Sequence, residues 1–247
     1  MTIKKKPSLN FAPQEGKQQL AFNMKVDVLV FGGSAGSGKS RLLLLKALAC
    51  AYKDPYFEGV VFRRTTTALR DGGGLFSEAK KLYAPLQPKV KEKDMIVEFT
   101  STNGGNIKFT HIEMESDAEK NHQGKQYSMC GFDELTQFTQ NQFLYLLGRL
   151  RSESTTDSFC MATCNPDPDS WVLNWVEDYL DEFGYPKPDW CGKIRYFVIV
   201  DDKPVFADDP KTLELQFPEL LWVTNDLTGE KVYVPPMSFS FINGTIN

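Results

Sequence analysis

The sequence has few of the residues that build disulfide frameworks, metal clusters or membrane spans. It has five cysteines, an odd number without paired spacing, and no secretory leader, which together indicate reduced thiols. Cys160 and Cys164 have no second cysteine pair beside them, and only two histidines are present, so a zinc site is not expected. No apolar run approaches the roughly 20 residues of a membrane helix. The basic N-terminus MTIKKKPSLNF lacks the apolar segment of a signal peptide.

The chain also lacks an excess of positive charge. Its 28 Lys and Arg against 32 Asp and Glu give a net charge of −4. This balance argues against a protein that coats nucleic acid by bulk charge. Local basic clusters could still contact nucleic acid, or could simply be solvated faces. The clusters are Lys4–Lys6, Arg63 with Arg64 and Arg70, Lys80 and Lys81 with 89–93, and Arg149 with Arg151.

Apolar strand-like segments alternate with helical segments over most of the 247 residues, which is enough for one large domain or two small ones. Helices are predicted at 14–22, 38–52, 75–84, 139–147 and 170–183. Strands are predicted at 26–31, 59–63, 95–100, 106–111, 127–132, 159–163 and 194–200. The alternation predicts an α/β fold with a mostly parallel sheet covered by helices on both faces.

The alternation of strand-like and helical segments ends near residue 201. The acidic stretch DDKPVFADDPK is typical of a surface loop, and its carboxylates are interpreted as solvated charge. The stretch LLWVTNDLTGEKVYVPP predicts a β-hairpin with Thr228 and Gly229 in its turn. Residues 201–247 are therefore expected to form a hairpin and linker region, and residues 1–13 a flexible arm.

A glycine-rich break between strand 26–31 and helix 38–52 carries the strongest motif. The stretch GSAGSGKS fits the phosphate-binding pattern G-x-x-x-x-G-K-[ST]. Backbone N–H groups of such a loop and of the helix start bind an anion, the lysine reaches the β- and γ-phosphates, and the hydroxyl holds Mg²⁺. A glycine-rich turn that binds nothing is the alternative. The expected nucleotide-binding residues are Gly33, Ser34, Ala35, Gly36, Ser37, Gly38, Lys39 and Ser40.

Hydrolysis of a bound nucleotide also needs carboxylates near the phosphates. Asp133 and Glu134 end the strand 127–132, and ligand sites of such sheets lie at the carboxyl ends of strands. Asp133 is expected to orient Mg²⁺ and Glu134 to polarise the attacking water. The alternative is an acidic pair that caps the next helix. Asn165 ends another predicted strand and could sense the γ-phosphate or the water, or could only form an Asn-Pro turn.

These pieces, in this order, resemble the large terminase subunit of tailed bacteriophages, the ATPase that packages viral DNA. The resemblance covers roughly residues 11–170. It rests on Gln18 in PQEGKQQLAF, the loop GGSAGSGKS, FDELTQF followed by LLGRLRS, and the TCNP turn. It implies a P-loop NTPase of the RecA-like type with an additional strand and a catalytic glutamate, which uses ATP and Mg²⁺.

The resemblance also implies residue roles. Gln18 would read the adenine edge, with Gln14 and Gln19 as nearby alternatives. Thr163 and Asn165 match the turn that couples hydrolysis to movement. Many family members carry an arginine in the loop near the position of Ala35, so the stabilising charge is expected from elsewhere. Arg149 or Arg151 would enter a neighbouring subunit's site, from a segment expected on the edge that bears the active site.

The same resemblance implies double-stranded DNA, the small terminase subunit and a homo-oligomeric ring on a portal as partners. It places the protein in the host cytoplasm, with no membrane partner. Family members are longer and carry a C-terminal nuclease domain, so residues 1–247 are expected to be the ATPase domain without nuclease activity. Two other functions stay open: another P-loop ATPase of helicase or recombinase type, and a nucleotide-dependent assembly module with negligible hydrolysis alone.

Overall fold

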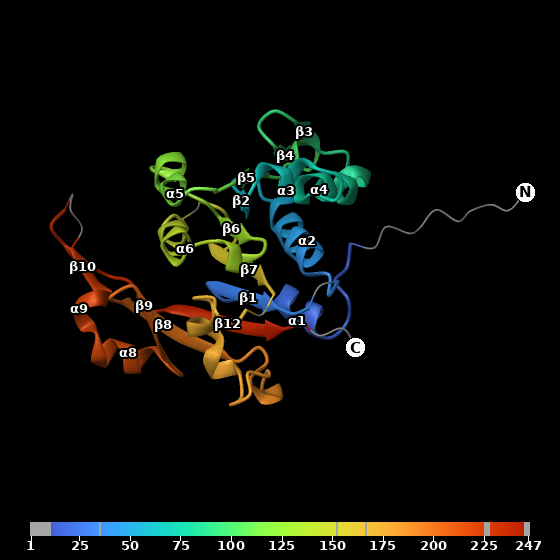
Figure 1. Cartoon of the computed structure of the whole chain (residues 1–247). Coiled ribbons are helices and arrows are strands. Elements are labelled where there is room, and N and C mark those ends of the chain that lie inside the picture. The colour runs from blue at the N-terminus through green and yellow to red at the C-terminus, as the bar shows by residue number, and fades with distance from the viewer. Residues whose placement is uncertain (1–10, 35, 152, 166, 225–227, 245–247) are drawn as a thin grey trace, which may run out of the picture.

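The fold is described from a computed structural model, which covers residues 11–34, 36–151, 153–165, 167–224 and 228–244. The strands of its main sheet are β1 (Val28–Gly32), β2 (Glu58–Arg63), β3 (Lys89–Lys91), β4 (Ile96–Glu98), β5 (Asn106–His111), β6 (Met129–Phe132), β7 (Phe159–Cys164), β8 (Ile194–Val200), β9 (Lys203–Ala207) and β12 (Met237–Asn243). They lie in the order β3-β4-β5-β2-β6-β7-β1-β12-β8-β9 (Figure 1). Neighbouring strands from β5 to β12 in this order are parallel, and the outer strands are antiparallel.

Helices cover both faces of this sheet, as the sequence predicts (Figure 1). They are α1 (Lys17–Asn23), α2 (Lys39–Ala51), α3 (Thr66–Arg70), α4 (Leu75–Tyr83), α5 (Glu115–His122), α6 (Gln140–Leu147), α7 (Leu173–Val176), α8 (Pro210–Gln216) and α9 (Pro218–Leu221). Successive residues of a strand point to opposite faces. On β1, Leu29 and Phe31 pack into the core under α2 and α4, whereas Val28 and Val30 pack into the core under α6 and α7.

The strand order places β7 between β6 and β1. The phosphate loop follows β1 and the acidic pair follows β6, so the two halves of the expected site lie on strands that are not neighbours. β7 joins them, with Thr163 paired to Phe31 of β1 and Ala162 paired to Phe132 of β6. The predicted additional-strand arrangement of a P-loop NTPase is confirmed.

Two predicted segments differ in the structure. The helix predicted at 170–183 is short: α7 ends at Val176, a 3₁₀ turn spans Glu177–Tyr179, and Leu180 bridges to Pro186. The acidic stretch after residue 200 is not only a loop, because β9 lies within it and pairs with β8 at the edge of the sheet. An edge position tolerates Pro204, which has no backbone N–H to donate.

The C-terminal region contributes to the core of the sheet. β12 lies beside β1 and is mostly buried. The predicted hairpin is present as β10 (Trp222–Thr224) paired with β11 (Lys231–Tyr233), and it projects from the body of the fold (Figure 1). Residues 1–10 of the expected arm lie outside the described residues. No helix in the described ranges is both long and apolar enough to cross a membrane.

Candidate active site

Two glycines of the phosphate loop occupy positions where a side chain would be strained. Gly33 has φ 150°, and a Cβ on it would lie 2.0 Å from the carbonyl oxygen of Gly244. Gly38 has φ 72° in the left-handed region, and a Cβ on it would lie 2.7 Å from Nε2 of Gln18. The loop therefore packs closely against two other segments of the chain. Ala35 lies outside the described residues.

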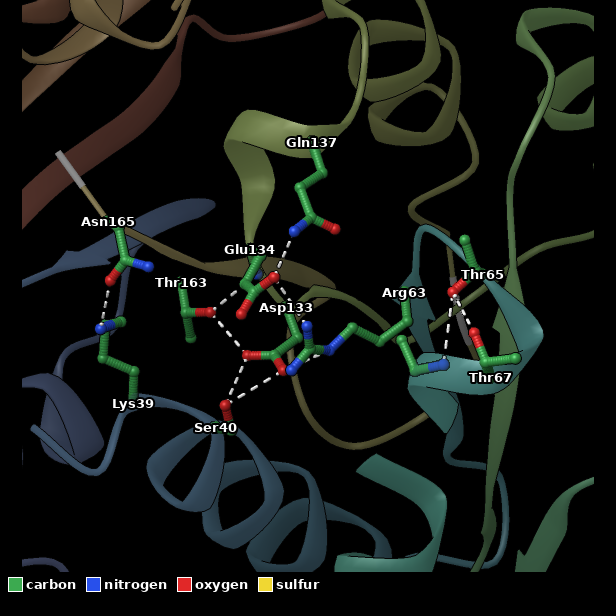
Figure 2. Close-up of polar contacts among 11 residues, drawn as sticks. Lys39, Ser40, Arg63, Thr65, Thr67, Asp133, Glu134, Gln137, Thr163 and Asn165 are labelled. Carbon is green, nitrogen blue, oxygen red and sulfur yellow. Dashed lines mark hydrogen bonds and ion pairs between the residues drawn. The ribbon is translucent and has the colours of Figure 1, made fainter. Parts of the chain in front are cut away.

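Lys39 begins α2 and turns its side chain back over the loop. Its Nζ donates to the carbonyl oxygens of Gly33 (2.7 Å) and Ser34 (2.8 Å). It also donates to Oδ1 of Asn165 at 2.8 Å (Figure 2). Burial lowers the pKa of Lys39, whereas the negative charges nearby, including Asp133 and Glu134, raise it. The lysine is thus held in place by groups that a phosphate can replace.

Asp133 is the centre of the site and is fully buried. Its carboxylate accepts hydrogen bonds from Oγ of Ser40, at 2.9 Å and 3.0 Å to its two oxygens, and from Oγ1 of Thr163 at 2.7 Å. The Thr163 hydroxyl in turn accepts the backbone N–H of Glu134 at 3.1 Å. Figure 2 shows this chain of contacts running from α2 through the ends of β6 and β7. The expected residues Ser40, Asp133, Glu134 and Thr163 therefore meet at one point.

Glu134 has an unusual backbone conformation. Its φ of 64° and ψ of 62° lie in the left-handed region, which costs a non-glycine residue about 1–2 kcal/mol. Its half-buried side chain accepts a hydrogen bond from the amide of Gln137. The neighbouring structure, including the hydrogen bond that the Glu134 N–H donates to Thr163, fixes this conformation and aims the carboxylate into the site.

Arg63 is a site residue that the sequence analysis named only as part of a basic cluster. It ends β2, and its Nε lies 2.7 Å from Oδ2 of Asp133 while its Nη1 lies 2.8 Å from Oε2 of Glu134 (Figure 2). The sequence offered one signal, since Arg63 ends a predicted strand. The proximity follows from the strand order, because β2 is the neighbour of β6.

Gln18 lies against the phosphate loop, as its expected role requires. It is 7% exposed, and its Nε2 donates to the carbonyl oxygen of Ser37 (2.8 Å) and to Oε1 of Gln14 (3.1 Å). Gln14 closes the pair by donating its backbone N–H to Oε1 of Gln18, whereas Gln19 is exposed. The reading of adenine by Gln18 stays a prediction.

Arg149 and Arg151 lie near the amino ends of the parallel strands, whereas the active site lies at their carboxyl ends. The expectation that they border the active site is therefore wrong. The N–H of Tyr127 donates to the carbonyl of Arg149 (2.9 Å), and the N–H of Arg151 donates to the carbonyl of Tyr127 (3.1 Å). Tyr127 precedes β6, and Asp133 follows it, roughly 20 Å along the strand. Helix α6 starts beyond the carboxyl end of β6 and must return to the amino edge before β7 begins. Entry of either arginine into a neighbour's site stays a prediction.

The donor set fits a hard divalent cation that is shared with phosphates. Mg²⁺ prefers oxygen ligands and keeps several of its waters, so that a protein supplies only one or two groups beside the substrate. Ser40 and Asp133 place a hydroxyl and a carboxylate in contact at the start of α2. Among the described residues no group of three or more His, Cys, Asp or Glu could hold a metal by itself. The site therefore suits Mg²⁺ delivered with a nucleotide.

The fold and this site define a P-loop NTPase with an additional strand between its two motif strands. The chain belongs to the family described as terminase large subunit, T4likevirus-type, N-terminal, whose model matches residues 30–238. No curated protein sequence matches it. The resemblance stated from the motifs is confirmed.

Solved structures agree on the fold. The large terminase of a thermophilic bacteriophage is similar at 19% identity with a TM-score of 0.53, over 71% of this chain and 45% of that one. The same terminase in complex with ADP gives 19% identity and a TM-score of 0.50, over 69% and 43% of the two chains. The chain thus spans less than half the length of these terminases.

Proposed function

We propose that this chain is the ATP-hydrolysing motor domain that drives double-stranded viral DNA into a procapsid. The observation that carries the proposal is the hydrogen-bonded chain from Ser40 through Asp133 and Thr163 to Glu134, at the mouth of the phosphate loop. A loop that binds phosphates, a buried carboxylate beside its hydroxyl and a second carboxylate next to it are the parts that ATP hydrolysis needs. Membership of the terminase family supports DNA packaging as the work performed.

Nucleotide binding would begin at Lys39. Its ammonium group gives up the carbonyls of Gly33 and Ser34 and the amide of Asn165 for the β- and γ-phosphates. Ser40 and Asp133 would hold Mg²⁺, which neutralises charge on the phosphate oxygens when it is bound. Gln18, already bonded to the loop, is proposed to contact the adenine edge.

Hydrolysis would depend on Glu134 as the residue that polarises water. Its strained backbone and the hydrogen bond from its N–H to Thr163 keep the carboxylate beside Asp133 without closing it off from solvent. Thr163 and Asn165 lie at the end of β7 and contact Asp133, Glu134 and Lys39. A change at the phosphates therefore reaches β7 through both residues, which supports their proposed role in coupling hydrolysis to movement.

The proposal includes partners. Double-stranded DNA is proposed as the translocated substrate, and a ring of copies of this chain on a portal as the active assembly. The small terminase subunit is proposed as a binding partner, and the infected host cell as the location. The described residues are proposed to form one ATPase domain. Steady-state ATP hydrolysis, measured with and without duplex DNA over a range of protein concentrations, tests this proposal.

The motor proposal expects turnover to rise with DNA and to rise faster than linearly with protein concentration. A flat rate per chain with no DNA effect contradicts a motor, and ATP binding without turnover favours the assembly module. Stimulation by single-stranded DNA alone favours the helicase or recombinase alternative. Mixing Arg149→Ala chains with Glu134→Gln chains tests the shared site, because recovery of activity requires an arginine from a neighbour.

A further inference from the structure

Arg63 forms ion pairs with the carboxylates of both Asp133 and Glu134. Its Nε lies 2.7 Å from Asp133 and its Nη1 lies 2.8 Å from Glu134, which makes two ion pairs, and the Nε contact lacks the geometry of a hydrogen bond. The Arg63 side chain is 17% exposed, compared with 0% for Asp133 and 30% for Glu134. The ion pair with Asp133 is thus largely removed from solvent, where charges interact more strongly than at a surface.

The other contacts of the Asp133 carboxylate come from neutral hydroxyls. Ser40 donates to both of its oxygens and Thr163 donates to Oδ1, so Oδ2 is shared between Ser40 and the Arg63 guanidinium. A neutral hydroxyl that is hydrogen-bonded to a carboxylate does not repel a metal ion at the same carboxylate. A guanidinium disfavours metal binding there, because two cations that share one carboxylate repel each other.

We propose that Arg63 is a positioning residue that holds Asp133 and Glu134 in the nucleotide-free site and is displaced from Asp133 when Mg²⁺ enters with the nucleotide. The inference rests on the proposed nucleotide function of this site. In the displaced state Arg63 keeps its contact with Glu134. Arg63 thereby competes with the metal for Asp133. Mg²⁺ then binds at Asp133 only together with a nucleotide, whose phosphates supply further ligands.

The structure gives Arg63 room for this movement. A cavity of about 380 Å³ lies beside it, and Ser40, Gly73, Glu78 and Lys81 are among its lining residues. Ser40 and Arg63 therefore share one cavity. Glu78 in the same cavity is paired with Lys81 at 2.7 Å and offers another carboxylate for a guanidinium that has left Asp133.

The test is the Mg²⁺ dependence of ADP binding, measured by calorimetry at a series of free Mg²⁺ concentrations. Arg63→Gln removes the charge and keeps a polar side chain of similar reach. The competing cation is then absent, and the half-saturating Mg²⁺ concentration is expected to fall about tenfold, as for the loss of one partly screened charge interaction. Arg64→Gln is the matched control, because Arg64 donates to the carbonyl of Ile112 (3.1 Å), and it is expected to leave the Mg²⁺ requirement unchanged.

Arg63→Lys provides a second variant if the glutamine variant does not fold. A lysine keeps the charge but cannot bridge two acceptors with one rigid fork, so the half-saturating concentration is expected to fall about two- to threefold. An unchanged or higher Mg²⁺ requirement in the folded variant overturns the inference and leaves the nucleotide function intact. Failure of the unaltered protein to bind ADP at any Mg²⁺ concentration overturns the proposed function as well.

Discussion

Replacing Thr163 by valine tests whether one hydroxyl joins the two catalytic carboxyl residues. Valine has nearly the same shape as threonine, so the fully buried position stays filled. The substitution removes the donor to Oδ1 of Asp133 at 2.7 Å and the acceptor of the Glu134 N–H at 3.1 Å. Asp133 is left buried with fewer donors, and the backbone of Glu134 loses its support in the left-handed region.

The expected loss follows from these two contacts. A hydrogen bond to a charged group contributes about 1.5–3 kcal/mol, and leaving a backbone donor unpaired costs about 1–3 kcal/mol. Because the two bonds share one hydroxyl, we expect Thr163→Val to lower the free energy of unfolding by about 3 kcal/mol. For a chain of this length that corresponds to a fall in Tm of about 6–12 °C.

Thermal unfolding of the nucleotide-free protein measures this loss, and Thr163→Ser is the control. Serine keeps the hydroxyl and loses one methyl group, which costs about 1 kcal/mol. The valine variant should therefore unfold at a lower temperature than the serine variant. If valine is equal to serine or more stable, the hydroxyl does not join Asp133 to Glu134 in the way described.

Two further predictions concern charge. Lys39→Ala should weaken ATP binding by at least about 100-fold in calorimetry, because Lys39 supplies the point charge on the phosphates; unchanged affinity would contradict the phosphate-loop assignment. Burial lowers the pKa of His122 to about 4, and Lys125 and Lys108 add to the shift. Since the unfolded chain binds this proton near pH 6.5 and the folded chain only near 4, stability is lost as the pH falls through that window. Chemical denaturation should show the unfolding free energy falling by about 2 kcal/mol more than in His122→Gln between about pH 7 and 4.5, and parallel pH profiles would refute this origin.

The parts of the site that the sequence predicts are those that depend on neighbours along the chain. The phosphate loop needs glycines at Gly33 and Gly38, because both occupy conformations that other residues rarely adopt and a Cβ at either would lie too close to a neighbouring segment. Asp133 and Glu134 were predictable because they directly follow an apolar strand. In each case the motif and the element that carries it lie within a few residues of each other.

The parts that the sequence did not predict depend on strand order. Arg63 meets the acidic pair because β2 lies beside β6, and a strand's ends do not reveal its neighbours. The acidic, proline-bearing sequence around β9 predicts a loop, whereas the structure has an edge strand there. The position of Arg149 could have been predicted, since a crossover helix must carry the chain back to the amino edge of a parallel sheet.

ATP binding and hydrolysis by Glu134→Gln, measured beside the unaltered protein, test most directly whether Glu134 activates the attacking water. The amide keeps the shape of the side chain and cannot accept a proton from water, and general base catalysis contributes about 10²–10⁴ in rate. If Glu134 is the base, the variant should bind ATP within a few-fold of the unaltered protein and hydrolyse it at least about 100-fold more slowly. Turnover at the unaltered rate, or ATP affinity lost together with hydrolysis, would contradict it.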